Sequence, residues 1–335
     1  MSNDKTQYAL KNKVSSKIDI TNKKAEYDEN VKWLLSEKII LAHILIYCVK
    51  EYKGMKPQEV AELIEGEPNV SEAMVNPGES NVSEITGDNT EDAVPNEGKI
   101  TYDIKFRTWA PDKSELIKLI VDIEAQKDYY PGYDILTRGV FYGARMLSSQ
   151  MGSEFTGDDY DKIKKVYSIW ICMNVPKYAE NTITEYSLQK KDIIGEFPSD
   201  RGRYDLMSII MVRLSKTIAE AGESTKLHRL LGALLSSRMT GQEKKDIIES
   251  EYNIPMQENV GRRVNIMCNL SDLIEEQGIE QGIEQGIEQG IERGIKELVQ
   301  TVKELTGSKD MTVNSLVKRY ELTKEMAREK VELYW

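Results

Sequence analysis

Histidine and cysteine are scarce in this chain, whose 335 residues include two histidines and three cysteines. Cys48, Cys172 and Cys268 lie far apart in apolar surroundings, so no usual spacing of zinc ligands is present. A serine or cysteine nucleophile would have only His43 or His228 as its base, and both histidines lie in helix-like segments, where a packed imidazole is the commoner case. Any chemistry is therefore expected to depend on carboxylates.

Long apolar segments are also missing. The longest apolar run, residues 39–49, is too short to cross a bilayer and has charged residues on both sides, so it predicts a buried helix. The first residues lack the apolar segment of a signal peptide, which together with the dispersed cysteines indicates the cytoplasm and no membrane partner. The net charge of −11 opposes nonspecific attraction to nucleic-acid phosphates.

The composition changes along the chain and predicts five segments. Residues 28–52 have apolar positions at helical spacing and predict one long helix. Between residues 59 and 97 every formal charge is negative, and the abundant Pro, Gly, Asn and Ser predict a loop-dominated insert with one short strand near residues 82–86. The expected segments are an N-terminal tail (1–27), a core that includes the insert (28–215), a helical cap (216–270), a repeat helix (271–300) and a small helical tail (301–335).

Two strand-like runs predict a β-hairpin. Apolar and polar residues alternate in "GKITYDIKFRTWA", residues 98–110, and again in "ELIKLIVDIEAQ", residues 115–126, with a Pro-Asp turn between them. Counted outward from the turn, Asp103 and Glu124 fall on neighbouring strands with roughly 5 to 8 Å between their Cβ atoms. Two carboxylates at that spacing can share one cation. The second strand becomes polar at its end, through Asp122, Glu124 and Gln126.

Further elements follow the hairpin. "PGYD" predicts the start of a helix over residues 135–150, in which Arg138, Tyr142 and Arg145 share one face. The nearly continuous apolar run of residues 164–176 predicts a strand covered on both faces. Two more strands are expected in residues 181–189 and 204–214, and amphipathic helices in residues 224–252.

The predicted elements follow the order helix, strand, strand, strand, helix, strand, with an acid on the second strand and an acid-x-polar triplet on the third. This order resembles the PD-(D/E)xK nuclease fold. The segments "ITYDIKF", "LIVDIEAQ", "TRGVFYGARMLSSQ" and "KKVYSIWICMNVPKY" resemble more closely the PD-(D/E)xK nuclease family transposases, which are related to the Rpn recombination-promoting nucleases. The resemblance runs from about residue 28 to the Gly-Ile-Glu repeat. It implies an α/β, restriction-endonuclease-like core, a mixed central sheet flanked by helices, with a helical C-terminal extension.

The same resemblance implies a DNA endonuclease linked to recombination or transposition. Asp103 and Glu124 would then bind a catalytic Mg²⁺, with Mn²⁺ as a substitute, and Gln126 would complete the catalytic set. Gln126 stands where the usual motif of the fold has lysine, and it can orient water or phosphate only by hydrogen bonds. Proteins of this branch commonly have glutamine there.

Other polar residues are candidates for supporting roles. They are Asp122, Lys127, Arg138, Tyr142, Arg145, Gln150 and Glu37, which could contact the phosphate or complete the acid set. The alternative for the strand acids is an exposed polar face whose charges are balanced by Lys105, Arg107 and Lys118. The alternative for the helix residues is that they only pack against the sheet or form ion pairs. The rival function is a catalytically inactive protein that binds nucleic acid or forms oligomers. A glycosidase is disfavoured because the sequence shows no aromatic-rich platform for a sugar.

Residues 275–297, "EEQGIEQGIEQGIEQGIERGIKE", form a four-residue repeat with glycine and isoleucine in register. On a helix each repeat advances about 40° past a full turn, so the glycine and isoleucine rows wind around the axis. Three interpretations remain open: a solvated spacer, a helix that joins copies into a homo-oligomer, or a repeat expansion. The tail from residue 311 predicts two short helices, the second capped by Thr323.

Overall fold

The computed structural model describes residues 22–70, 91–94, 98–112, 115–127, 129–236, 238–256 and 259–335. The chain divides into two compact units, Met1–Ser271 and Asp272–Trp335, and the boundary falls within helix α7 (Asn259–Thr306). The first unit contains a mixed sheet flanked by helices, and the second is helical. The expected α/β class with a helical C-terminal region is confirmed.

The first helical segment is interrupted, so the prediction of one long helix over residues 28–52 is wrong. Residues 22–35 are helical, and α2 (Lys38–Cys48), η1 (Lys50–Tyr52) and α3 (Pro57–Glu62) follow. At the break, Ser36 Oγ donates a hydrogen bond to the Trp33 carbonyl at 2.8 Å, and Glu37 is extended with φ −60° and ψ 125°. A side chain that bonds to the preceding backbone competes with helix continuation, so α2 begins anew.

Six strands form the central sheet in the order β1-β4-β5-β6-β8-β7. They are β1 (Asn69–Val70), β4 (Ile104–Asp112), β5 (Glu115–Gln126), β6 (Lys165–Cys172), β7 (Thr182–Ser187) and β8 (Met207–Arg213). The β4–β5 hairpin is antiparallel, β5, β6 and β8 run parallel, and β7 and β1 are antiparallel to their neighbours. The β4–β5 hairpin and the later strands β6, β7 and β8 confirm predictions from periodicity, and every residue of β6 is buried, as its apolar run indicated.

The expected first strand of the hairpin is two strands in different sheets. β3 (Gly98–Thr101) pairs with β2 (Glu91–Val94) in a separate two-stranded sheet, and β4 starts only at Ile104. The chain leaves strand geometry at Tyr102 and Asp103, where the Asp103 side chain and backbone bond to β5. Of the acidic insert, residues 71–90 and 95–97, with the strand expected near residues 82–86, lie outside the described residues.

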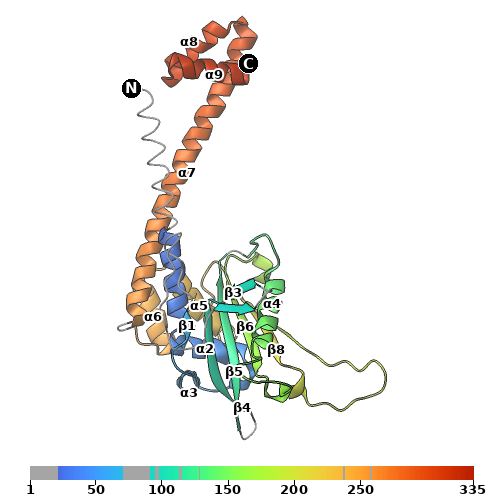
Figure 1. Ribbon diagram of the computed structural model, residues 1–335. Helices are drawn as coiled ribbons and strands as arrows, with labels where there is room; N and C mark the ends of the chain where they lie inside the picture. The colour runs from blue at the N-terminus through green and yellow to red at the C-terminus, as the bar shows by residue number, and fades with distance from the viewer. Residues whose placement is uncertain are drawn as a thin grey trace. The chain divides into compact units, whose positions relative to one another are not determined.

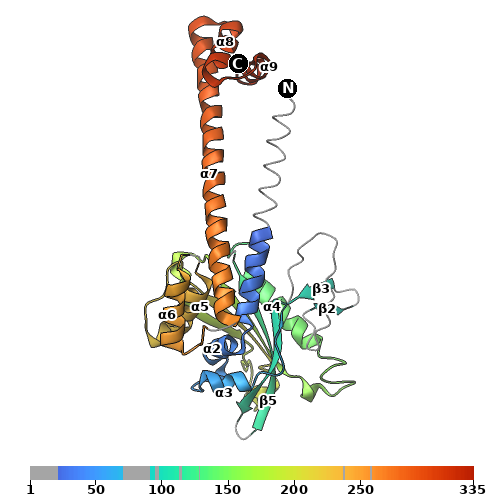
Figure 2. The ribbon, with the colours of Figure 1, turned by 90° about the vertical axis from the view of Figure 1, so that its left-hand side faces the viewer.

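Helix α4 (Ile135–Ser148) connects β5 to β6 and lies over one face of the sheet, whereas α2 and α5 lie on the other side (Figures 1 and 2). Asp134 caps it by accepting a hydrogen bond from the Thr137 N–H at 3.2 Å. Two glycines let it approach the strands closely. A Cβ atom at Gly139 would lie 2.9 Å from Ile209 Cγ2, and one at Gly143 would lie 2.8 Å from Met207 Sδ.

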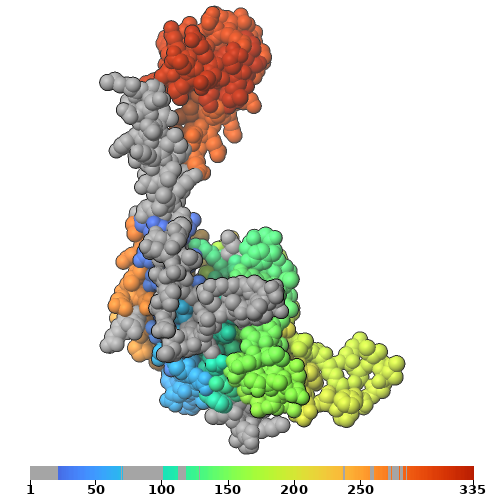
Figure 3. All heavy atoms as spheres, viewed as in Figure 1, coloured from blue at the N-terminus to red at the C-terminus, as the bar shows by residue number. Residues whose placement is uncertain are grey.

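Two further helices precede α7 in the first unit, α5 (Lys226–Leu235) and α6 (Gly241–Tyr252), and both were expected from their amphipathic pattern. Thr240 and Glu243 form a capping box at the start of α6. Residues 188–200, all exposed, project from the unit as an arm after β7 (Figure 3). No helix in the described part of the chain combines the length and the apolar character that a membrane crossing needs.

The second unit packs the end of α7 against α8 (Lys309–Tyr320) and α9 (Lys324–Tyr334). The expected pair of tail helices is confirmed, and Thr323 Oγ1 caps α9 by accepting from the Met326 N–H at 3.2 Å. The repeat is helical throughout. Its last isoleucine, Ile295, is buried in this core, whereas the four before it are 45 to 59% exposed: Ile279, Ile283, Ile287 and Ile291. Homo-oligomerisation through the repeat helix stays a prediction.

Candidate functional site at the end of the β4–β5 hairpin

The hairpin register brings two of the predicted carboxylates together. Ile104 pairs with Ile123, and Asp103 and Glu124 are the residues that come next beyond this pair on the two segments. The Asp103 N–H donates to Glu124 Oε1 at 2.9 Å, and the Ala125 N–H donates to Asp103 Oδ2 at 3.1 Å. Each carboxylate is therefore held by the backbone of the opposite segment.

Asp122 adds a third acid on the same face of β5, two residues before Glu124. The Ser168 hydroxyl, on the neighbouring strand β6, donates to Asp122 Oδ2 at 3.0 Å, and the Trp170 indole N–H donates to Ser168 Oγ at 2.9 Å. Asp122 is fully buried, and its Oδ1 has no hydrogen-bond partner among the described residues. We call Asp103, Asp122 and Glu124 the acid cluster.

The buried acids of this cluster are difficult to ionise. Burial is the first cause that raises the pKa of Asp122 to about 8, and the negative charge of Asp103 adds to it, whereas the Ser168 hydrogen bond acts in the opposite direction. Burial and the charges of Asp122 and Asp103 likewise hold the pKa of Glu124 well above its usual value. Near neutral pH the buried pair therefore retains a proton, which belongs to the pair and not to one residue.

Two cations lie against the acid cluster. Lys32 Nζ, from the helical residues 22–35, is 2.8 Å from Asp103 Oδ1, and Arg138 Nη2, from α4, is 3.9 Å from Glu124 Oε2. Arg138 also donates to the Tyr142 hydroxyl at 2.7 Å, and its guanidinium lies 5.3 Å from the centre of the Trp170 ring. Sequence reasoning missed Lys32, because no local pattern connects a lysine of the first helix with an acid of the hairpin.

Two other predicted residues, Gln150 and Glu37, lie elsewhere. The Gln150 amide donates to the carbonyl of Lys164 at 2.9 Å and its Oε1 accepts from the Lys164 N–H at 2.7 Å, so it clamps the end of α4 to the start of β6. That end of β6 is five pairs from Glu124 along the ladder, or roughly 16 Å. The charges that act on Glu37 are those of Arg263 and Glu67, and burial raises its pKa. The structure does not bring Gln150 or Glu37 into the cluster.

The remaining predicted residues, Arg145, Gln126 and Lys127, lie in three different environments. Arg145 is buried in α4. The carbonyl of Gln126 accepts from the Met173 N–H at 2.9 Å, which fixes the end of β5 against the segment after β6. Lys127 is exposed, and its Nζ lies 5.5 Å from the centre of the Tyr27 ring.

The donor set of the cluster suits a hard divalent cation. Mg²⁺ and Mn²⁺ prefer carboxylate oxygens, and a cation would satisfy the unpaired Oδ1 of Asp122 and relieve the repulsion among the acids. Within the described ranges, no group of three or more His, Cys, Asp or Glu side chains has the arrangement of a metal site. In the structure, Lys32 and Arg138 supply the positive charge beside the acids.

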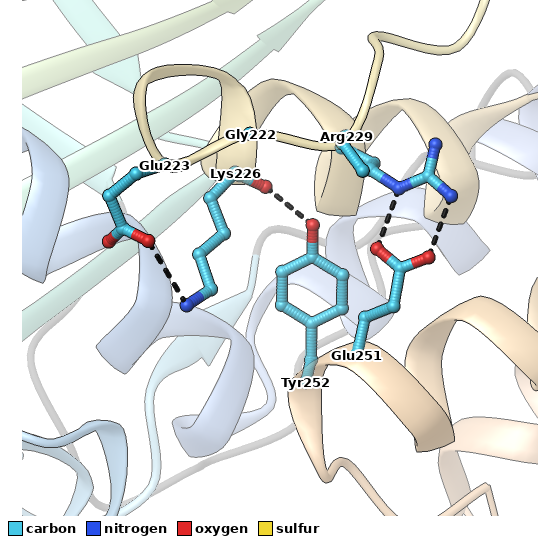
Figure 4. Close-up of a pocket in the computed structure, with 7 residues that line it drawn as sticks. Gly222, Glu223, Lys226, Arg229, Glu251 and Tyr252 are labelled. Atoms are coloured by element: carbon cyan, nitrogen blue, oxygen red, sulfur yellow. Dashed lines mark hydrogen bonds and ion pairs between the residues drawn. The ribbon is translucent and has the colours of Figure 1, made fainter.

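Two hollows occur away from the acid cluster, both in the first unit. One, of about 230 Å³, lies between α5 and α6, and its polar side chains bind one another (Figure 4). Arg229 forms two hydrogen bonds of 2.6 Å with Glu251, and the Tyr252 hydroxyl donates to the Lys226 carbonyl at 2.7 Å. The other, of about 720 Å³, lies between α2 and strands β7 and β8. Neither contains a predicted site residue.

Exposed tyrosines gather beside the acid cluster, which contradicts the interpretation that no aromatic-rich platform is present. Tyr130, Tyr133 and Tyr178 are 70%, 50% and 81% exposed. We call these three residues the tyrosine surface. The sequence signal was the "YYPGY" segment, but Tyr178 joins it only in the folded chain. The buried Asp122 and Glu124 still differ from the acids of an open sugar cleft.

Comparison of the chain with family models, with curated proteins and with solved structures finds no match.

Proposed function

We propose that this protein is a Mg²⁺-dependent phosphodiesterase that cleaves DNA, of the PD-(D/E)xK transposase-like type, with a role in recombination or transposition. The observation that carries the proposal is the pair Asp103 and Glu124, bonded across the end of an antiparallel hairpin, with a buried third acid whose Oδ1 lacks a hydrogen-bond partner among the described residues. Three acids held this close, although burial opposes their ionisation, support the proposal that a cation binds here.

The roles of the residues follow from their contacts. Asp103 and Glu124 would hold the divalent cation, with Asp122 behind them. When bound, the cation polarises the phosphodiester and lowers the pKa of a water molecule that serves as nucleophile. The backbone bonds between the two segments keep both carboxylates in place before substrate arrives, so little reorganisation is needed.

Lys32 and Arg138 are proposed to balance charge during the reaction. Gln126 carries no charge, so the ammonium that the usual motif provides has no counterpart on β5 itself. Lys32 is 18% exposed and already lies 2.8 Å from Asp103, which places a positive charge from another element beside the acids. With the carboxylates occupied by a cation, Lys32 and Arg138 would be available to contact a phosphate oxygen, for which arginine and lysine are suited.

Cleavage of supercoiled plasmid tests the proposal. Nicking should require Mg²⁺ or Mn²⁺ and should fall by at least about 100-fold in Asp103→Asn and Glu124→Gln, as expected when a ligand of a catalytic cation is lost. Glu154→Gln is the matched control, because Glu154 pairs with Arg107 outside the cluster and its removal should leave nicking unchanged. Calorimetric titration of Mn²⁺ into wild type and Asp103→Asn measures cation binding independently of activity.

The alternative function is a catalytically inactive protein that binds nucleic acid or forms oligomers. The neutral Gln126 and the presence of Lys32 and Arg138 against the acids favour it, because an acid cluster neutralised by its own side chains needs no metal. In that case neither Mg²⁺ nor Mn²⁺ would bind to the wild type, plasmid would stay intact, and Asp103→Asn would change neither result.

A further inference from the structure

We infer that this site acts on unpaired nucleic acid, whose bases stack on the tyrosine surface. The inference rests on the proposed function and specifies its substrate. Aromatic side chains normally bury most of their area, whereas Tyr130 and Tyr178 expose 70% and 81% of theirs. A group of exposed rings beside a polar site is a surface on which flat ligands stack.

Parallel strands place these tyrosines at the acid cluster. Tyr130 and Tyr133 lie in the segment that joins β5 to α4, and Tyr178 lies in η3 (Lys177–Ala179), which follows β6. Because β5 and β6 are parallel, both segments leave the sheet at the same end, where β5 carries Glu124. The hydroxyls of Tyr130 and Tyr178 are 3.3 Å apart, so residues from two connections form one surface.

Arg138 connects the tyrosine surface to the acids. Its Nη1 donates to the Tyr133 hydroxyl at 2.8 Å, and its Nη2 lies 3.9 Å from Glu124 Oε2. Arg138 therefore lies between the Tyr133 hydroxyl and the acid cluster, where it can contact the phosphate of a strand that passes from the rings to the acids. Lys127 and Lys177, both exposed, follow the ends of β5 and β6 and provide further positive charge for that phosphate.

The charge of the chain favours stacking as the main source of affinity. With a net charge of −11, the protein gains little from the general attraction that dominates binding to duplex DNA. Stacking needs no net charge, and each stacked base strengthens binding by roughly 5-fold to 150-fold. Bases in a duplex already stack on one another and present only their edges, so the tyrosine surface selects single-stranded or unpaired segments.

Fluorescence anisotropy of the full chain tests this inference. The probes are a labelled single strand of about 16 nucleotides and the duplex made from it, at one salt concentration and in EDTA, so that no cleavage consumes them. The single strand should bind more tightly than the duplex. The double variant Tyr130→Ala/Tyr178→Ala should weaken single-strand binding by about 10-fold or more, whereas Tyr130→Phe/Tyr178→Phe, which keeps the rings, should change it by less than about 3-fold. Tyr160→Ala is the matched control, because Tyr160 is 56% exposed and precedes the opposite end of β6.

Three results would overturn the inference: equal or tighter binding of the duplex, unchanged single-strand binding in the double alanine variant, or binding of an oligosaccharide in place of either nucleic acid. The proposed function fails separately. If the single strand binds through the tyrosines but is not cut with Mg²⁺ or Mn²⁺, the stacking surface stands and the nuclease activity does not. If plasmid is nicked through Asp103 and Glu124 without preference for unpaired segments, the activity stands and the substrate assignment fails.

Discussion

The buried acids Asp122 and Glu124 should make the protein less stable as pH rises, and Asp122→Asn should weaken that dependence. Burial raises the pKa of Asp122 from 3.8 to about 8, so between these values the folded chain keeps a proton that the unfolded chain has released. For one such proton the free energy of unfolding falls by about 1.4 kcal/mol per pH unit. Over about pH 6.5 to 8 the loss approaches 2 kcal/mol in wild type. Asparagine has no proton to lose, and its oxygen can still accept the Ser168 hydrogen bond.

The assay is urea unfolding of wild type and Asp122→Asn at several pH values in this window. Buried His43 contributes with the opposite sign, since its pKa is lowered to about 4, but its effect lies mainly below pH 6.5 and cancels in the difference. As pH rises from 6.5 to 8, the free energy of unfolding of Asp122→Asn should increase by up to about 2 kcal/mol relative to that of wild type. Ser168→Ala removes the hydrogen bond that opposes the rise in the pKa of Asp122. The free energy of unfolding of this variant should therefore keep falling to a higher pH than that of wild type. Parallel curves for wild type and Asp122→Asn would refute the reasoning, because they would mean that Asp122 ionises normally in the folded chain.

Substitutions at three glycines and at one helix cap should change the stability of the two units. Gly286→Ala should stabilise the repeat helix by about 1 kcal/mol, since its Cβ would meet nothing within 4 Å. Gly294→Ala should stabilise the helix less, or destabilise it, because its Cβ would overlap the Tyr320 hydroxyl. Thermal melts followed by circular dichroism compare the two variants. Gly139→Ala should destabilise the first unit by about 1 to 3 kcal/mol because its Cβ would press α4 away from β8, and a melt unchanged from wild type would contradict that close approach. Thr240→Ala should cost about 1 kcal/mol through loss of the α6 capping box, measured by urea unfolding, with the serine variant as the control that keeps the cap.

Periodicity and turn chemistry were sufficient for the part of the site that lies within one hairpin. The register of a hairpin counts outward from its turn, so the positions of Asp103 and Glu124 in the sequence already made them neighbours. The same local logic identified the buried strand β6 from its unbroken apolar run and the start of α4 from Asp134. It failed at Ser36, where a side chain bonded to the preceding turn ends a helix whose apolar spacing continues.

The sequence by itself thus determined the β4–β5 hairpin with its two nearby acids, strand β6 and the helical tail, because each depends on contacts within a short stretch of chain. Only the tertiary structure decided what surrounds those acids. Lys32 reaches Asp103 from the first helix, and Ser168 reaches Asp122 from the next strand. Tyr178 meets Tyr130 because two connections leave the same end of a parallel sheet. These contacts join residues far apart in sequence, so they follow from which elements pack together and not from any spacing along the chain.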